Sequence, residues 1–104
     1  MQKCEDLVPG EVLNAMREEW PLFKADLYGD PLLCVKFSRR LMCAIRHLPL
    51  RLSLKTTNDT DKAIEAGARK DPTLFVNNNL FIEGLVTAER ITVEFTKLLK
   101  QTNS

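Results

Sequence analysis

The side chains best suited to covalent chemistry in this sequence are the thiols of Cys4, Cys34 and Cys43. Two cysteines separated by two residues can cycle between dithiol and disulfide, but the chain contains no such Cys-x-x-Cys pair. Three cysteines are also too few, and odd in number, for a framework of structural disulfides. Together with the single histidine, His47, they lack the spacing of a zinc site. The sequence therefore predicts no metal site and no cofactor, and single-thiol chemistry is the redox activity to consider.

Cys34 falls near the start of a helix predicted over residues 31–47. Asp30 is suited to the N-cap, Pro31 to the first helical position, and Pro49 closes the helix. Cys34 lies on the apolar stripe of this helix, where free cysteine commonly packs as a small hydrophobic residue. Cys34 is thus either a packing residue or a monothiol redox residue. The predicted buried stripe consists of Cys34, Phe37, Leu41, Ala44, Ile45 and Leu48.

Cys43 falls on the opposite, basic face of the same helix. Arg39 and Arg40 lie one turn before it and Arg46 one turn after it, and such cations favour a thiolate. Cys43 is therefore a candidate reactive thiol, although a cysteine on a solvated face is usually without function. Nine residues separate it from Cys34, which is roughly 13 Å along a helix, so the two cannot form a disulfide unless the helix breaks.

Positive charge is concentrated in residues 31–58, which contain six Lys or Arg residues and no Asp or Glu. Six bases make a weak signal for nucleic-acid binding. The acidic segment 1–30 also offers an intramolecular partner for them. We therefore expect no nucleic-acid partner, and an anion or nucleic-acid binder remains only a third hypothesis. The candidate anion patch is formed by Lys36, Arg39, Arg40 and Arg46.

Strands are predicted where apolar and polar residues alternate between turn signals. The segments LFKADLY and LRLSLK alternate in this way, as half-buried strands do. Asn78 and Asn79 suit the positive φ angles of a two-residue hairpin turn between two further strands. The four predicted strands cover residues 22–28, 50–55, 73–77 and 80–84.

The remaining helices are predicted from apolar spacings of three and four and from capping residues. One covers residues 9–20, a short one begins after Asn58 or Asp59 and ends at Gly67, and the last follows Thr87. A strand, helix, strand order at the front implies a parallel pair, and the hairpin adds an antiparallel pair. The sequence predicts a single α/β domain over residues 1–104, with a mixed four-stranded sheet flanked by helices.

The order of these elements resembles the thioredoxin fold. The stretches FKADLYGDPLLCVKFSRRLMCAIRHL and DPTLFVNNNLFIEGLVTAERITVEFTKLL look like the two halves of small thioredoxin/glutaredoxin-like redox proteins. The resemblance covers residues 22–100 and leaves residues 1–21 as an N-terminal helical extension. It implies that Pro72 is a cis-proline beside the active-site loop, whereas the sequence without the resemblance favours a trans bond. An acid at Asp71 would disfavour a thiolate in that loop.

The resemblance also implies a degenerate active site. The family's C-x-x-C aligns with Pro31-Leu32-Leu33-Cys34, so that Cys34 matches the second, resolving cysteine and Pro31 replaces the nucleophile. In an alternative alignment Cys34 is the nucleophile of a C-x-x-F motif, but Pro31 then no longer marks the helix start.

We therefore expect a thioredoxin-like domain of the thiol-disulfide redox lineage that has lost dithiol catalysis and acts as a binding or accessory module for a protein partner. The alternative is a monothiol oxidoreductase in which Cys34 forms mixed disulfides with glutathione or a protein thiol. No apolar run is long enough to span a bilayer, and the N-terminus carries acids where a signal peptide is apolar. We expect a cytoplasmic protein with no membrane partner. The predicted binding residues are Pro31, Asp71, Pro72 and Thr73.

Overall fold

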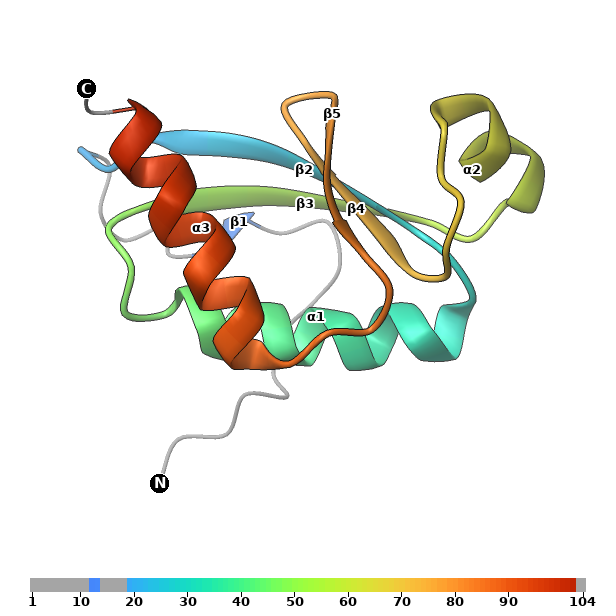
Figure 1. The fold of residues 1–104 in the computed structure, drawn as a ribbon, viewed down its shortest axis with the longest axis horizontal. Coiled ribbons are helices and arrows are strands. Elements are labelled where there is room, and N and C mark those ends of the chain that lie inside the picture. The colour runs from blue at the N-terminus through green and yellow to red at the C-terminus, as the bar shows by residue number, and fades with distance from the viewer. Residues whose placement is uncertain (1–11, 14–18, 103–104) are drawn as a thin grey trace.

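The computed structural model describes residues 12–13 and 19–102 of the chain. Within these residues the fold is α/β, and Figure 1 shows the strands and helices in the order in which they follow one another. The elements are β1 (Val12–Leu13), β2 (Leu22–Tyr28), α1 (Pro31–Ile45), β3 (Arg51–Thr57), α2 (Thr60–Ala66), β4 (Thr73–Val76), β5 (Asn79–Glu83) and α3 (Ala88–Thr102).

The described strands form one mixed sheet in the order β1-β3-β2-β4-β5. The central pair, β2 and β3, is parallel and is connected through α1. The strands β4 and β5 form an antiparallel hairpin, and β4 also pairs antiparallel with β2. The predicted mixed sheet of four strands is therefore confirmed, and β1 adds two residues at its other edge.

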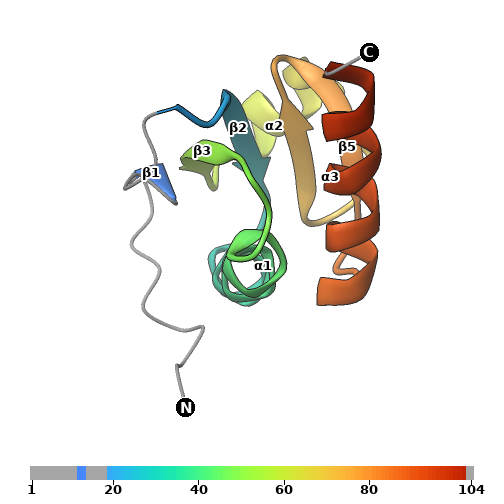
Figure 2. The same ribbon diagram turned by 90° about the vertical axis from the view of Figure 1, so that its left-hand side faces the viewer.

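The hydrophobic core lies on the face of the sheet that carries α1 and α3. Figure 2 shows α1 on one side of the strands and α3 beside β5. The predicted alternation of β2 is confirmed, because Phe23, Ala25 and Leu27 are buried and the residues between them are not. The predicted stripe of α1 is also buried, except that Leu48 is only partly buried. The largest buried side chains from the two helices are Phe37, Leu41, Ile45, Ile91 and Phe95.

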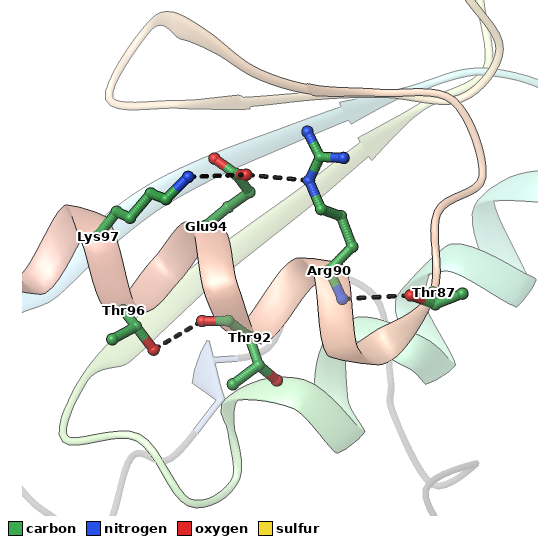
Figure 3. A network of polar contacts seen from close by, with 6 residues as sticks. All are labelled: Thr87, Arg90, Thr92, Glu94, Thr96 and Lys97. Atoms are coloured by element: carbon green, nitrogen blue, oxygen red, sulfur yellow. Dashed lines mark hydrogen bonds and ion pairs between the residues drawn. The ribbon is translucent and has the colours of Figure 1, made fainter.

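The helix α3 is fixed at its start and along its length by side-chain bonds (Figure 3). Thr87 caps it, as predicted, by accepting a hydrogen bond from the backbone N–H of Arg90 at 3.2 Å. Arg90 in turn pairs with Glu94 at 3.0 Å, one turn further on. Thr92 lies where α3 meets α1. Its hydroxyl is 3.0 Å from the Ala88 carbonyl of α3 and 3.2 Å from the Ala44 carbonyl of α1, and the two carbonyls share its single proton.

The helix predicted over residues 9–20 is wrong where the structure describes it. Val12 and Leu13 form β1, which pairs antiparallel with Ser53 and Leu52 of β3. Glu19 and Trp20 are in a turn, and the rest of the predicted helix lies outside the described residues. Without β1, this edge of β3 would present unpaired backbone N–H and C=O groups. Pairing with that edge outweighs the helical spacing of the apolar residues, which is only a weak preference.

The hairpin turn lies one residue earlier than predicted. Asn77 and Asn78 have the positive φ angles, 51° and 67°, whereas Asn79 is the first residue of β5 and pairs with Val76. Asn77 is held in the turn by Lys24, because its backbone N–H donates to the Lys24 carbonyl at 2.7 Å and its side-chain oxygen accepts from the Lys24 N–H at 3.1 Å. These two bonds select Asn77 from three consecutive asparagines that all tolerate the left-handed conformation.

Candidate functional site

Three loops meet where the parallel strands β2 and β3 end. The chain leaves β2 toward α1 and leaves β3 toward α2, and Figure 1 shows these two helices on opposite sides of the strands. In open α/β sheets a crevice forms where neighbouring strands send their connections to opposite sides, and ligands commonly bind there. A cavity of about 340 Å³ occupies this place. Its lining includes Gly29, Pro31, Asn58, Ile64, Arg69 and Asp71.

One peptide unit in the wall of this crevice is held at both of its polar groups. The side-chain amide of Asn58, which follows β3, donates to the carbonyl of Gly29 at 2.9 Å. The N–H of the same Gly29–Asp30 peptide unit, on Asp30, donates to Oδ1 of Asp71 at 2.9 Å. Two side chains from distant loops therefore fix the connection between β2 and α1.

Gly29 allows the loops before α1 and before β4 to approach each other closely. A Cβ atom on Gly29 would lie 2.2 Å from Oδ1 of Asp71 and 3.0 Å from Cα of Pro72. Its φ angle of +153° also lies in a region that residues with side chains rarely adopt. The Asp71–Pro72 peptide bond is cis, as the family resemblance implies.

The start of α1 is capped as the sequence predicts. Asp30 Oδ2 accepts hydrogen bonds from the backbone N–H groups of Leu32 at 3.0 Å and Leu33 at 3.4 Å. The helix begins at Pro31, as the first of the two alignments requires. Cys34 is thus the fourth residue of α1, and its N–H already donates to the carbonyl of Asp30 at 2.8 Å.

Cys34 is a buried thiol with 2% of its surface exposed, and it belongs to the hydrophobic core. Its sulfur is not in a disulfide. Burial, together with the negative charges of Asp71 and Asp30, raises the pKa of Cys34 from 9.0 to about 11. The thiolate is the nucleophilic form of cysteine. At neutral pH Cys34 is therefore protonated and shielded from solvent.

Cys43 does not provide a free thiol in this structure. Its sulfur is in a disulfide bond, so a reactive thiol at this position stays a prediction for the reduced protein. The cations beside it on α1 favour a thiolate only where a free thiol exists. The exclusion of a Cys34–Cys43 disulfide holds, since Cys34 is free.

The predicted anion patch on α1 is only partly exposed. Lys36 and Arg39 are exposed, but Arg40 and Arg46 are partly buried. The guanidinium of Arg40 donates to the carbonyl of Val86 at 2.9 Å, which ties α1 to the segment before α3. The helical repeat brings Arg40 over this segment, so one of the four predicted anion ligands has a structural role.

Of the four predicted binding residues, Pro31 and Asp71 line the crevice, whereas Pro72 and Thr73 are buried. The hydroxyl of Thr73 donates to the carbonyl of Lys70. The carbonyl of Pro72 accepts from the N–H of Gly84 at 2.7 Å. These two residues therefore support the crevice from inside, and their side chains are not part of its surface.

Asn58 and Ile64 are site residues that the sequence did not reveal. Asn58 was one of two candidates for the cap of α2, but Asp59 is the cap, with Oδ1 accepting from Asp61 N–H at 2.9 Å. Ile64 lines the crevice with 66% of its surface exposed. The available signal was Ile64 itself, a large apolar residue in a short segment whose other residues are polar or alanine.

Within the described residues, no group of three or more His, Cys, Asp or Glu side chains is placed to hold a metal ion. In the same part of the chain, no helix is long and apolar enough to cross a bilayer. Comparison of the sequence and the structure with protein-family models, curated proteins and solved structures found no match.

Proposed function

We propose that this chain is a thioredoxin-like binding module that has no thiol chemistry and that takes an extended segment of a partner protein in the crevice between the β2–α1 loop and α2. The observation that carries the proposal is the pre-formed crevice of about 340 Å³, whose wall is the peptide unit held by Asn58 and Asp71. The bond from the Asp30 N–H to Asp71 keeps this peptide unit ordered even when the Asn58 bond breaks, and an ordered wall lowers the entropy lost on binding.

The burial and the raised pKa of Cys34 argue against thiol catalysis and so favour a binding role for the protein. A monothiol oxidoreductase needs an accessible thiolate, and its pKa is usually lowered by cations or a helix N-terminus. Cys34 lies at such a helix start, but only 2% of its surface is exposed, and burial, together with Asp71 and Asp30, raises its pKa. No other observation in the described part of the chain favours the monothiol hypothesis.

The exposed side of α2 favours an apolar residue in the partner segment. Ile64 and Ala63 line the crevice, and 66% of the surface of Ile64 is accessible. Covering that surface contributes roughly 1–2 kcal/mol, which is the exposed share of the free energy of burying one isoleucine. A cavity of this size is at the lower end of the range for ligand pockets. It suits a few side chains of a peptide rather than a large cofactor.

The proposal is tested by selecting peptides from a display library of random 12-residue sequences on the immobilised protein. We expect enriched sequences with an apolar residue in common, and amide shift changes in ¹⁵N spectra at residues 29–31 and 58–71. Ile64→Glu should weaken binding at least tenfold. Val93→Glu is the matched control, because Val93 is also an exposed apolar residue (47%) but lies on α3. Failure to enrich any sequence, or shift changes confined to other surfaces, would contradict the proposal.

A further inference from the structure

The helix α2 is attached to the rest of the protein mainly through its two ends. None of its seven residues is buried. A helix this short is not stable alone in water, so its own capping bonds must hold it together. Asp59 caps its first turn through Asp61 and Lys62, and Gly67 closes its last turn with φ +97° and an N–H bond to Ile64 at 3.0 Å. Because these bonds lie within the segment, none of them has to break when α2 changes its position relative to the sheet.

The contacts that hold this segment in place are polar and exposed. Before α2, the amide of Asn58 donates to the carbonyl of Gly29 at 2.9 Å. After α2, the guanidinium of Arg69 pairs with Glu83 at 3.2 Å, with 75% of the Arg69 side chain exposed. An exposed ion pair contributes little to stability, and so does a single exposed hydrogen bond between neutral groups. Both contacts are weak enough to break and re-form at room temperature.

We propose that α2 is a hinged lid on the crevice, latched by the hydrogen bond between Asn58 and Gly29. The lid turns about residues 58–59 and 67–69, and opening breaks the Asn58–Gly29 bond and the Arg69–Glu83 pair. The hinge at Gly67 is sterically free, since a Cβ atom there would meet nothing within 4 Å. The role of the lid depends on the proposed function, which is peptide binding in the crevice. Closing over an apolar side chain of the partner buries Ile64, which is largely exposed in the free protein.

The lid is tested on the free protein, without a peptide, by ¹⁵N relaxation dispersion. We expect exchange between two states for amides of residues 58–70 and none for amides of β2, β3 or α1. Asn58→Ala should raise the population of the open state roughly two- to tenfold, which is the range that one hydrogen bond implies. Asn79→Ala is the matched control, because Asn79 also donates its amide to a backbone carbonyl, that of Asn77 at 3.4 Å, but in the β4–β5 hairpin. This variant should leave the exchange of α2 unchanged.

Arg69→Ala is a second, independent test of the lid. It removes the Arg69–Glu83 pair and leaves the β2–α1 loop intact. It should also raise the open population. The lid would be overturned if α2 showed no exchange in the wild type, Asn58→Ala and Arg69→Ala. It would also be overturned if the strands of the sheet showed the same exchange as α2. The peptide selected above should suppress the exchange when it binds. If α2 shows exchange but the protein selects no peptide, the lid is supported and the proposed function is contradicted. If the protein binds a peptide but α2 shows no exchange, the proposed function is supported and the lid is contradicted.

Discussion

The carboxylate of Asp71 accepts a hydrogen bond from the backbone N–H of Asp30 at 2.9 Å, although the two residues lie 41 positions apart in the sequence. This bond joins the start of α1 to the loop before β4. It also places two carboxyl groups close to Cys34, and both raise the pKa of that thiol. The same contact therefore orders the wall of the crevice and adds to the effect of burial, which is the main cause of the raised pKa of Cys34.

Replacing Asp71 separates these two effects. Asp71→Ala removes the acceptor for the Asp30 N–H and should lower the free energy of unfolding by about 1 kcal/mol, since the bond is exposed. Asp71→Asn keeps an acceptor oxygen and should cost less, while the loss of the charge lowers the pKa of Cys34. Urea unfolding gives the first quantity, and the ¹³Cβ chemical shift of Cys34 followed against pH gives the second. Equal losses of stability in both variants would show that the hydrogen bond has no role.

Gly29 and Gly67 form a matched pair of glycines with positive φ. Gly67→Ala meets open space and should cost only the strain of its φ angle, about 1 kcal/mol. Gly29→Ala also places a Cβ 2.2 Å from Oδ1 of Asp71 and must displace that carboxylate. It should therefore cost a further 1–2 kcal/mol or so through the lost hydrogen bond. Urea unfolding of the two variants compares them directly, and equal costs would contradict the close packing of the two loops.

The stability of the protein should fall as the pH rises from 9 to 11, and part of this fall belongs to Cys34. Burial, Asp71 and Asp30 raise the pKa of Cys34 in the folded state from 9.0 to about 11. The stabilising effect is therefore complete below pH 9 and is lost as the pH rises toward 11, because the unfolded chain ionises first. The total loss is at most about 2–3 kcal/mol.

Cys34→Ala is the comparison, because every other effect of high pH acts on both proteins alike. The free energy of unfolding of the wild type should fall more steeply between pH 9 and 11 than that of the variant. Parallel curves would show that the thiol is not held in its neutral form by the fold.

Arg40 and Arg39 are neighbours on α1 with different predicted contributions. Arg40→Ala removes the bond to the carbonyl of Val86 and should cost about 1 kcal/mol. Arg39 is exposed, so Arg39→Ala should change stability by no more than about 0.5 kcal/mol. Thermal unfolding of the two variants tests this difference. A larger loss in Arg39→Ala would mean that the basic face of α1 packs differently.

Local signals in the sequence were sufficient for most of the fold. Asp30 and Pro31 mark the start of α1, alternation marks β2, and Gly67 marks the end of α2, because these features depend on neighbouring residues. The start of the chain was not predictable in the same way. Val12 and Leu13 have helical spacing with the residues that follow them, but the strand depends on the free edge of β3, which exists only once the sheet has formed.

The site was predictable only in part for the same reason. Cys34, Pro31 and Asp71 could be grouped from the family resemblance, and the structure places Pro31 and Asp71 at the crevice. Asn58 and Ile64 reach it through the turn of the chain from β3 to α2, on the side of the sheet opposite α1. No local sequence pattern predicts on which face of the sheet a short helix without buried residues will lie.

The central claim is that the crevice binds an extended peptide and that Cys34 takes no part in it. It is tested most directly by the dissociation constants of one selected peptide for the wild type, Cys34→Ser and Ile64→Glu. We expect a change of less than about twofold for Cys34→Ser, because the thiol is buried and neutral. For Ile64→Glu we expect a loss of at least tenfold, which is about 1.4 kcal/mol or more. Binding that is abolished in Cys34→Ser, with a folded protein, and retained in Ile64→Glu would contradict it and return thiol chemistry to the centre of the function.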